Sequence, residues 1–330
     1  MEKRRTLWPL LTLFFIAPAI GELLSGSSPP AEFFHPFGLF FLAALYGSGA
    51  ILIRERRVRM GKGWPAVLAL GAAYGIVEEG LMVKSFFDPN WVDLGLLGHY
   101  GRWAGVNWVW SLQLTIYHAV FSIAIPILLV ELLFPASRGE RWLGRRGMIG
   151  FSLLLAADVL FGSLFLAPYR PPVIPYLLAF LTVVGLVLLA RRLPDGTGTT
   201  QAHPRSKPAL RPALLGFGAT FFFFLIFWAL PALEVPVVLT VLAVVVLVIA
   251  VAWAVRRMSR GGGWTDEHRL ALASGALTFF VLLAPLQELD ASRPDDTRGM
   301  TLVGLATLGL LVLLRRRVKR RLRAEDQPAR

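Results

Sequence analysis

The sequence predicts an all-α protein, a polytopic transmembrane helical bundle of about ten spans with both termini in the cytoplasm. Its 330 residues are 55% hydrophobic and fall into charge-poor blocks of about 20 residues, the length that a helix needs to cross about 30 Å of hydrocarbon. Lys and Arg residues gather in alternate loops, and Trp residues lie near the ends of the blocks. Both distributions are typical of helical membrane proteins.

The ten predicted spans follow the charge-poor blocks in order. They are 7–24, 37–54, 64–84, 105–134, 148–168, 172–190, 212–231, 235–255, 270–287 and 299–314. In this topology 5 of the 34 Lys and Arg residues face the outside, and the other 29 lie on the side of the termini. The positive-inside rule assigns that basic side to the cytoplasm. The first block follows MEKRR like a signal peptide, but we expect a retained helix, with cleavage as the alternative.

Composition excludes several classes of function. The net charge of +13 follows the topology, so the expected partners are the lipid bilayer and anionic lipid at the cytoplasmic face, and not nucleic acid. The chain has no Cys, which excludes disulfide and thiol chemistry. It has no GxxxxGK or HExxH motif. No cofactor is expected, and the sequence does not identify a protein partner.

Polar residues divide the chain into two parts. Residues 1–147 form a four-span half that carries most of the polar residues expected inside the membrane, and residues 148–330 form a more hydrophobic six-span half. The segment 191–211 is rich in Pro, Gly and Thr and is predicted to be a cytoplasmic linker.

The stretch GIVEEGLMVKSFF, residues 75–87, places two adjacent glutamates in a predicted span. Glu79 lies four and eight residues after Gly75 and Gly71, so the three share one stripe of the helix. Glycines with this spacing let another helix approach closely, and the stripe is therefore predicted to face protein. Two carboxyls in a poorly solvated place need a proton or a partner. Such a pair is a candidate general base or proton carrier, and pairing with Arg102 or on the Arg54 side is the structural alternative.

The fourth span carries a stripe of polar residues that is predicted to face the bundle. They are Asn107, Ser111, Thr115, His118 and Ser122, whereas Trp110 is expected to point elsewhere. Polar residues of this kind commonly serve as hydrogen bonds between helices. His118 shares the stripe with four polar neighbours and follows the glutamate helix in an antiparallel direction, so it is the predicted partner of the glutamates.

The candidate site is therefore drawn from the first four spans. Glu78, Glu79 and His118 are the catalytic candidates. Residues expected to position substrate or water are Asn107, Ser111, Thr115, Ser122, Glu22 and Arg102. Asp158 is a further intramembrane acid, with a role as proton site, remote partner of His118 or neutral buried acid left open. No metal is expected, because none of the five histidines forms an i, i+4 pair of the kind that marks zinc-binding helices.

A helix with paired glutamates, followed by a histidine on a later helix, resembles the glutamate-type intramembrane proteases of the CAAX-processing and bacteriocin-immunity kind. In that family an EExxxR motif, later histidines and an asparagine hold and activate a water. Glu78 and Glu79 match the paired acids. His118 and Ser122, in HAVFS, are similar to the HxxxN pattern with Ser in the asparagine place. The resemblance covers about 50 of the 330 residues.

The sequence departs from that family's pattern at two positions. Val83 stands where the motif has arginine, and Lys84 follows one residue later. Leu114 precedes His118 where an FxxxH motif has phenylalanine.

Three function classes follow from these residues. The first is a hydrolase in which Glu79 or Glu78 acts as general base on a water and His118 assists or stabilises the oxyanion, with Asn107 or Ser111 placing the substrate. The second is a carrier in which the same groups and Asp158 relay protons. The third is a structural or partner-binding membrane protein whose polar stripe only holds helices together.

Overall fold

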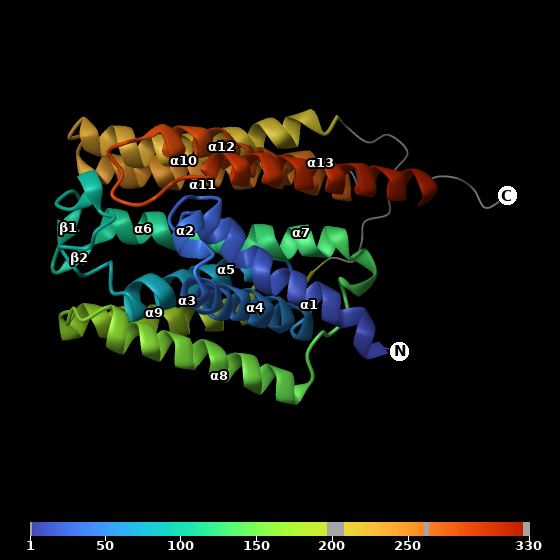
Figure 1. Ribbon diagram of the computed structural model, residues 1–330, viewed down its shortest axis with the longest axis horizontal. Helices are drawn as coiled ribbons and strands as arrows, with labels where there is room; N and C mark the ends of the chain where they lie inside the picture. The colour runs from blue at the N-terminus through green and yellow to red at the C-terminus, as the bar shows by residue number, and fades with distance from the viewer. Residues whose placement is uncertain (1, 197–207, 261–263, 326–330) are drawn as a thin grey trace.

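The computed structural model describes residues 2–196, 208–260 and 264–325. In these residues the chain is an all-α bundle with one very short β-hairpin (Figure 1). Nine helices of the described chain are long and apolar enough to cross a membrane: Thr6–Leu23, Pro36–Arg59, Trp64–Met82, Trp108–Leu133, Arg145–Leu166, Val173–Arg192, Leu210–Ala232, Val237–Ser259 and Asp266–Leu289. These nine match the first nine predicted spans, which confirms the predicted fold class.

Each of the first five spans contains a π-helical segment. The spans are, in order, α1 (Glu2–Pro18) with η1 (Ala19–Leu23), α3 (Pro36–Leu42) with η2 (Ala43–Gly47) and α4 (Ser48–Arg59), α5 (Trp64–Gly75) with η3 (Ile76–Met82), α6 (Trp108–Tyr117) with η5 (His118–Ala124) and α7 (Ile125–Leu133), and α8 (Arg145–Phe161) with η7 (Gly162–Leu166). The later helices are regular along the described chain: α9 (Val173–Arg192), α10 (Leu210–Ala232), α11 (Val237–Ser259), α12 (Asp266–Leu289) and α13 (Met300–Glu325).

Short elements occupy the connections. They are α2 (Pro30–Phe33), η4 (Gly95–Leu97), η6 (Pro135–Ser137) and the antiparallel strands β1 (Arg102–Trp103) and β2 (Val106–Asn107). The hairpin occupies the first residues of the predicted fourth span, so that helix begins at Trp108 and not at 105. Asn107 caps it, because its side-chain oxygen accepts a hydrogen bond from the backbone N–H of Trp110.

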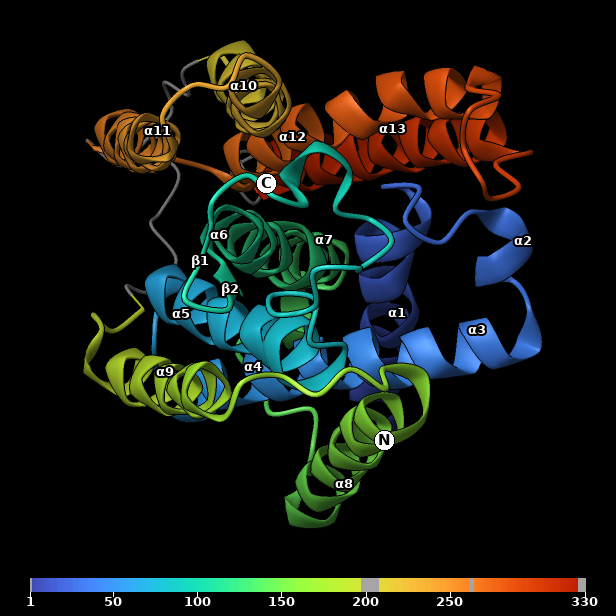
Figure 2. The same cartoon turned by 90° about the vertical axis from the view of Figure 1, so that its left-hand side faces the viewer.

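The helices form three layers. Helices α10–α13 lie together on one side, α8 and α9 lie on the opposite side, and α1 and α4–α7 fill the middle (Figures 1 and 2). Exposure follows this order, because the membrane-spanning window of the fourth span is 72% buried and those of α8 and α9 are 6% buried. The apolar side chains on the outer layers are those expected to contact lipid. The polar residues of the first half therefore lie at the centre.

The predicted tenth span is the first part of α13. Its apolar sequence runs from Met300 to Leu314, and Arg315 begins a basic continuation of the same helix. The apolar part is thus shorter than those of the nine other helices. It packs along α12 (Figure 2).

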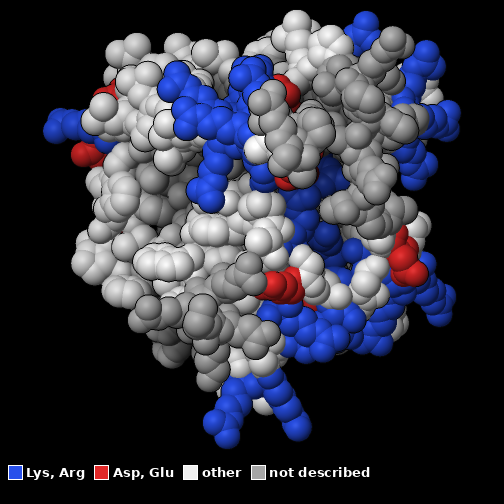
Figure 3. Space-filling model, turned by 90° about the vertical axis from the view of Figure 1, so that its right-hand side faces the viewer, with Lys and Arg blue, Asp and Glu red and all other residues white. Residues whose placement is uncertain are grey.

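Basic residues gather at the end of the bundle where α1 begins and α13 ends (Figures 1 and 3). Arg54 is fully buried there and donates hydrogen bonds to the carbonyl oxygens of Ser137, Arg138 and Glu140 at 2.6–2.8 Å. It also pairs with Glu55 at 2.8 Å. The Arg54 guanidinium thus fixes the connection between α7 and α8 to α4.

A second ionic contact at this end ties the layers together. Asp266, the first residue of α12, pairs with Arg138 at 2.7 Å, with Arg321 of α13 at 2.6 Å and with Arg269 at 3.3 Å. A carboxylate at a helix N-terminus is also favoured by the helix dipole.

Arg54→Met should lower the free energy of unfolding by about 3–5 kcal/mol, because it leaves buried carbonyl and carboxylate oxygens without their donor. Thermal melts of the detergent-purified protein measure the loss. Arg56 is exposed on the same helix, and Arg56→Met should change the stability by about 0.5 kcal/mol or less. Equal losses in the two variants would contradict the role given to Arg54.

Candidate functional site

The candidate site residues lie in π-helical segments of four different spans. Segment η1 carries Glu22, η2 carries Tyr46, η3 carries the two glutamates, and η5 carries His118 and Ser122. A π-helical turn inserts an extra residue into an α-helix and is frequent at functional sites. Here the extra residue in each span changes the direction of the side chains near the middle of the bundle.

Close packing of α5 against η5 sets the distance between the glutamates and the histidine. A Cβ atom on Gly71 would lie 2.9 Å from the Ala119 Cα, and one on Gly75 would lie 2.9 Å from the His118 Cβ. Only glycine allows the two backbones to approach this far. The prediction that the Gly71, Gly75 and Glu79 stripe faces protein is confirmed.

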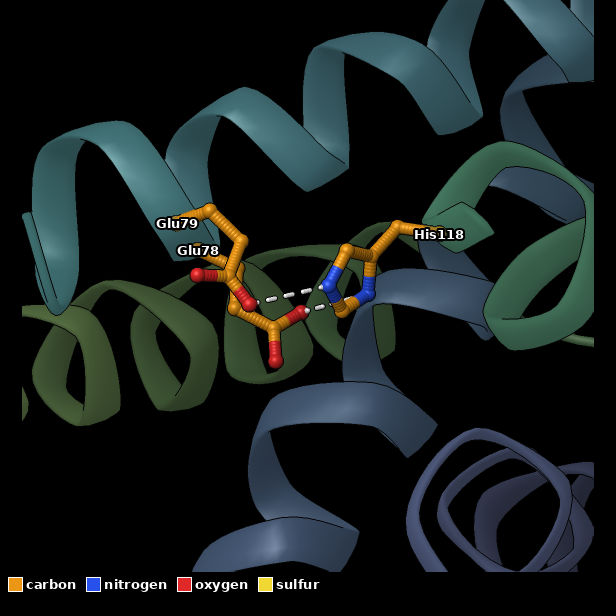
Figure 4. A group of neighbouring side chains, drawn as sticks. All are labelled: Glu78, Glu79 and His118. Atoms are coloured by element: carbon orange, nitrogen blue, oxygen red, sulfur yellow. Dashed lines mark hydrogen bonds and ion pairs between the residues drawn. The ribbon is translucent and has the colours of Figure 1, made fainter. Parts of the chain in front are cut away.

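The imidazole of His118 faces the two carboxylates, with one ring nitrogen paired with each (Figure 4). Its Nε2 is 3.1 Å from Oε1 of Glu79, and its Nδ1 is 3.2 Å from Oε2 of Glu78. Ser122 Oγ lies 3.0 Å from the same Nδ1. The rings of Tyr46, Tyr74 and Tyr117 pack around the imidazole at centroid distances of 5.4–6.1 Å. The ring is 2% exposed, so its orientation is fixed on every side.

Glu79 is the more accessible carboxylate of the pair. Its side chain is 14% exposed, whereas that of Glu78 is 6% exposed. Oε2 of Glu79 accepts a hydrogen bond from Ser85, and the Ser85 Oγ accepts one from the Trp110 indole at 3.0 Å. One oxygen of Glu79 is therefore held by the imidazole and the other by a hydroxyl.

A second polar group adjoins the first. Glu22 accepts hydrogen bonds from the Tyr46 hydroxyl and from Ser28 at 3.0 Å. A Cβ atom on Gly21 would lie 3.0 Å from Ser122 Oγ and 2.8 Å from the Tyr46 ring. Glu22 is therefore connected to His118 through Tyr46, whose hydroxyl binds Glu22 and whose ring packs against the imidazole.

The other predicted positioning residues lie outside this centre. Asn107 and Ser111 bond to backbone at the start of α6, and Thr115 lies where that helix passes Gly75. Arg102 bonds to the carbonyl oxygens of Phe87, Asp88 and Gly98 in the loop between η3 and α6. The neighbouring cation Lys84, two residues beyond the end of η3, binds the carbonyl oxygens of Ser163 and Ala167 at 2.6 Å. Neither of these two cations pairs with Glu78 or Glu79.

Asp158 lies on α8, near the polar centre. It interacts electrostatically with Tyr74, whose ring packs against His118. Its Oδ2 atom is shielded from solvent and forms no hydrogen bond within the described residues.

Acidic side chains of the connecting loops lie close to the site. Burial raises the pKa of Asp93, and the negative charge of Glu79 raises it further. Burial also raises the pKa of Glu32, with added repulsion from Asp295 and Asp93. These loops thus add negative charge near the site.

The contacts of the site that were not predicted include Tyr46, Tyr74, Tyr117, Ser85 and Trp110. Trp110 was expected to point away from the polar stripe, but the length of its indole lets the Nε1 atom reach Ser85. Tyr46 and Tyr74 are aromatic residues inside apolar spans, where periodicity does not separate a site residue from a packing residue. Ser85 follows Glu79 by six residues, just after the glutamate helix, and this closeness in sequence is the signal that could have identified it.

Glu78, Glu79 and His118 could also hold a cation. One ligand atom from each of the three lies within 4.8 Å of the others. Two carboxylates and an imidazole are common metal ligands.

These observations define a polytopic helical membrane protein with a carboxylate–imidazole site inside the bundle. The chain belongs to an uncharacterized membrane protein family, whose model matches residues 11–320. It is similar to an uncharacterized protein of Archaeoglobus fulgidus, at 24% identity over 128 residues, which is 38% of this chain and 39% of that relative. No solved structure matches the chain.

Gly75→Ala should separate α5 from η5, because the added methyl group meets the Cβ of His118 at 2.9 Å. The overpacking should cost about 1–3 kcal/mol of stability, measured by thermal melts. Gly185→Ala is the matched control, since a Cβ on that residue of α9 meets no atom within 4 Å. It should leave stability unchanged or raise it by up to about 1 kcal/mol through helix propensity. A Gly75→Ala protein as stable as the Gly185→Ala protein would contradict the close approach.

Proposed function

We propose that this protein is an intramembrane hydrolase in which Glu79 and His118 activate a water molecule. The observation that carries the proposal is the position of the His118 imidazole, with Nε2 3.1 Å from Glu79 and Nδ1 3.2 Å from Glu78. A general base and the group that orients it need this distance from one another.

Accessibility assigns the roles of the two glutamates. Glu79 is the more exposed of the two and meets the water. The more buried Glu78 and Ser122 hold Nδ1, the ring nitrogen that does not contact Glu79. The hydrogen bond from Ser85 fixes the Glu79 carboxylate. In the hydrolytic step Glu79 takes a proton from water as the hydroxyl oxygen bonds to the scissile carbonyl carbon, and the His118 N–H donates a hydrogen bond to the carbonyl oxygen as it becomes an oxyanion. The oxyanion then re-forms the carbonyl as the bond to the leaving group breaks, and Glu79 returns its proton to the leaving group.

The resemblance to glutamate-type intramembrane proteases supports this chemistry. In that family the paired glutamates and a later histidine hold the reacting water, and here the corresponding residues are 39 positions apart in sequence and in direct contact. The departures are Val83 in the place of the arginine and Leu114 in the place of the phenylalanine. Lys84, the residue after Val83, binds Ser163 and Ala167 and not the glutamates. The peptide or ester nature of the scissile bond is left to the experiment.

Isotope labelling tests the proposal without a known substrate. Detergent-solubilised host membranes are incubated in H2(18)O with the purified protein, and mass spectrometry detects products that carry one added (18)O. The wild type should produce labelled products, and Glu79→Gln should lower their rate of formation by about 100-fold or more. Asp158→Asn keeps the Glu79–His118 pair intact and should retain most of the activity. Labelling that is equal in the wild type and Glu79→Gln would overturn the proposal.

Proton transport is the second candidate, favoured by one observation. The Tyr74 hydroxyl and Oδ2 of Asp158 are both shielded from solvent, and neither forms a hydrogen bond of standard geometry with the described residues. Tyr74 packs against His118 and interacts electrostatically with Asp158, so it is the candidate link between the two groups. A carrier would lose its function in Asp158→Asn, in contrast to the hydrolase.

We also propose that the basic end of the bundle faces the cytoplasm and contacts anionic lipid. Residues 315–323 of α13 include seven Lys and Arg residues, and such clusters beside a span attract anionic headgroups. Both ends of the described chain lie at this face (Figures 1 and 3).

Cysteine labelling tests this orientation, because the chain has no Cys of its own. Asn90→Cys places a thiol in the outer loop, and Gly139→Cys places one at the basic end where no atom lies within 4 Å of the new Cβ. In right-side-out vesicles an impermeant maleimide should label Asn90→Cys at once. Gly139→Cys should react only after the vesicles are opened, and the reverse pattern would contradict the orientation.

A further inference from the structure

We infer that four arginines at the basic end of the bundle form a binding site for a phosphate group with two negative charges. They are Arg57, Arg138, Arg269 and Arg321. Free phosphate, a soluble phosphate monoester and the headgroup of a phosphomonoester lipid all supply such a group. The site shares no residue with the carboxylate–imidazole site. It rests on the proposed orientation only for the compartment that supplies the phosphate.

The four arginines come from four different parts of the bundle. Arg57 belongs to α4, Arg138 to the connection between α7 and α8, Arg269 to α12 and Arg321 to α13. Asp266 holds three of them, at 2.7 Å from Arg138, 2.6 Å from Arg321 and 3.3 Å from Arg269. Arg269 also interacts electrostatically with Arg57 and with Glu131, the carboxylate that Arg57 contacts at 2.8 Å. The guanidinium groups therefore gather where the middle layer meets α12 and α13.

The ion pairs at this place leave an excess of positive charge. Two adjoining groups of pairs join six arginines and four carboxylates, which are Arg54, Arg57, Arg59, Arg138, Arg269 and Arg321 with Glu55, Glu131, Asp266 and Glu325. Like charges repel one another more strongly where they are partly shielded from water. A phosphate group with a charge of about −2 would balance this excess.

Hydrogen-bond donors remain in the cluster for a further acceptor. Nε of Arg138 is shielded from solvent and forms no hydrogen bond with the described residues. The side chain of Arg269 donates a single hydrogen bond within the same residues, to Asp266 at 3.3 Å, although a guanidinium has five N–H donors. Guanidinium groups bind the oxygens of a phosphate in pairs, so the unused donors match a phosphate group.

A small anion can reach these arginines. Their side chains are 15–24% exposed, so they lie below the surface without being sealed from water. Lys and Arg side chains line a hollow in this face of the molecule (Figure 3). Arg317 of α13 is fully on the surface instead, as the positive-inside rule alone would place a basic residue. Convergence from four elements distinguishes the four arginines from such a residue.

The experiment uses the full-length protein in detergent and follows thermal melts during titration with sodium phosphate. Sodium chloride keeps the ionic strength constant. We expect a saturable rise in Tm, because a ligand that binds the native state stabilises it. Chloride alone should give no such rise, and a Tm that phosphate leaves at its chloride value would overturn the inference.

Two lipid probes distinguish the sources of the phosphate group. Dioctanoyl phosphatidic acid carries a phosphomonoester, whereas dioctanoyl phosphatidylcholine carries a choline-capped phosphate on the same acyl chains. Phosphatidic acid that acts at concentrations about 10-fold or more below those of inorganic phosphate identifies a lipid headgroup, and a similar or weaker effect identifies a soluble phosphate. A rise with both lipids and none with inorganic phosphate would come from the acyl chains and would overturn the inference.

Matched variants locate the site. Arg269→Gln removes a guanidinium that Asp266 holds at the longest of its three distances, and it should weaken phosphate binding by about 10-fold or more. Arg317→Gln removes the same charge from the surface of α13 and should bind phosphate as the wild type does. Equal weakening in the two variants would indicate a general attraction between charges and would contradict a defined site.

A measurement on the wild type does not depend on how the variants fold. Phenylglyoxal modifies arginine side chains, and mass spectrometry of the peptides gives the rate at each position. Saturating phosphate should slow the modification of Arg269 and Arg321 several-fold and leave the rate at Arg317 unchanged. A rate at Arg269 that is the same with and without phosphate would contradict the inference.

Discussion

The contact between α5 and η5 is the constraint on which the site depends. Gly71 and Gly75 have no side chains, so the backbones of the two spans come close enough for the next residue of the stripe, Glu79, to reach His118. In a membrane there is no hydrophobic force between helices, and association relies on close packing and polar contacts. Both are present along this line, so the same stripe that joins the helices also places Glu79 beside His118.

Four π-helical segments turn this contact into a polar centre. In an α-helix, neighbouring residues such as Glu78 and Glu79 differ by about 100° in direction. Their side chains nevertheless both reach His118 from η3, one at each ring nitrogen. The distortions in η1 and η2 bring Glu22 and Tyr46 to the same centre. The regular helices α9–α13 carry none of these groups, and they cover the core and face lipid.

Sequence alone was enough to predict the spans and the central pair, because each signal was local. Apolar length gave nine of the spans, and the i, i+4 glycines showed which face of α5 would meet another helix. The π-helical turns had no local signal, since they arise from packing between spans. Tyr74 and Trp110 were missed for a related reason: their polar atoms sit at the ends of large rings and reach across gaps that helical periodicity does not describe. The tenth predicted span is shorter than the others, because basic residues follow Leu314 within the same helix.

The contacts of Asp266 indicate an order in which the parts of the bundle assemble. Its carboxylate binds Arg138, which precedes it by 128 residues, and Arg321, which follows it by 55. A growing chain folds from its N-terminal part onward. The middle layer is therefore synthesised before Arg138 has its counter-ion. Arg138 pairs with Asp266 only when α12 has been synthesised. The three-arginine cluster closes after α13 has been synthesised, so a complete ionic contact marks a chain whose last helices have docked.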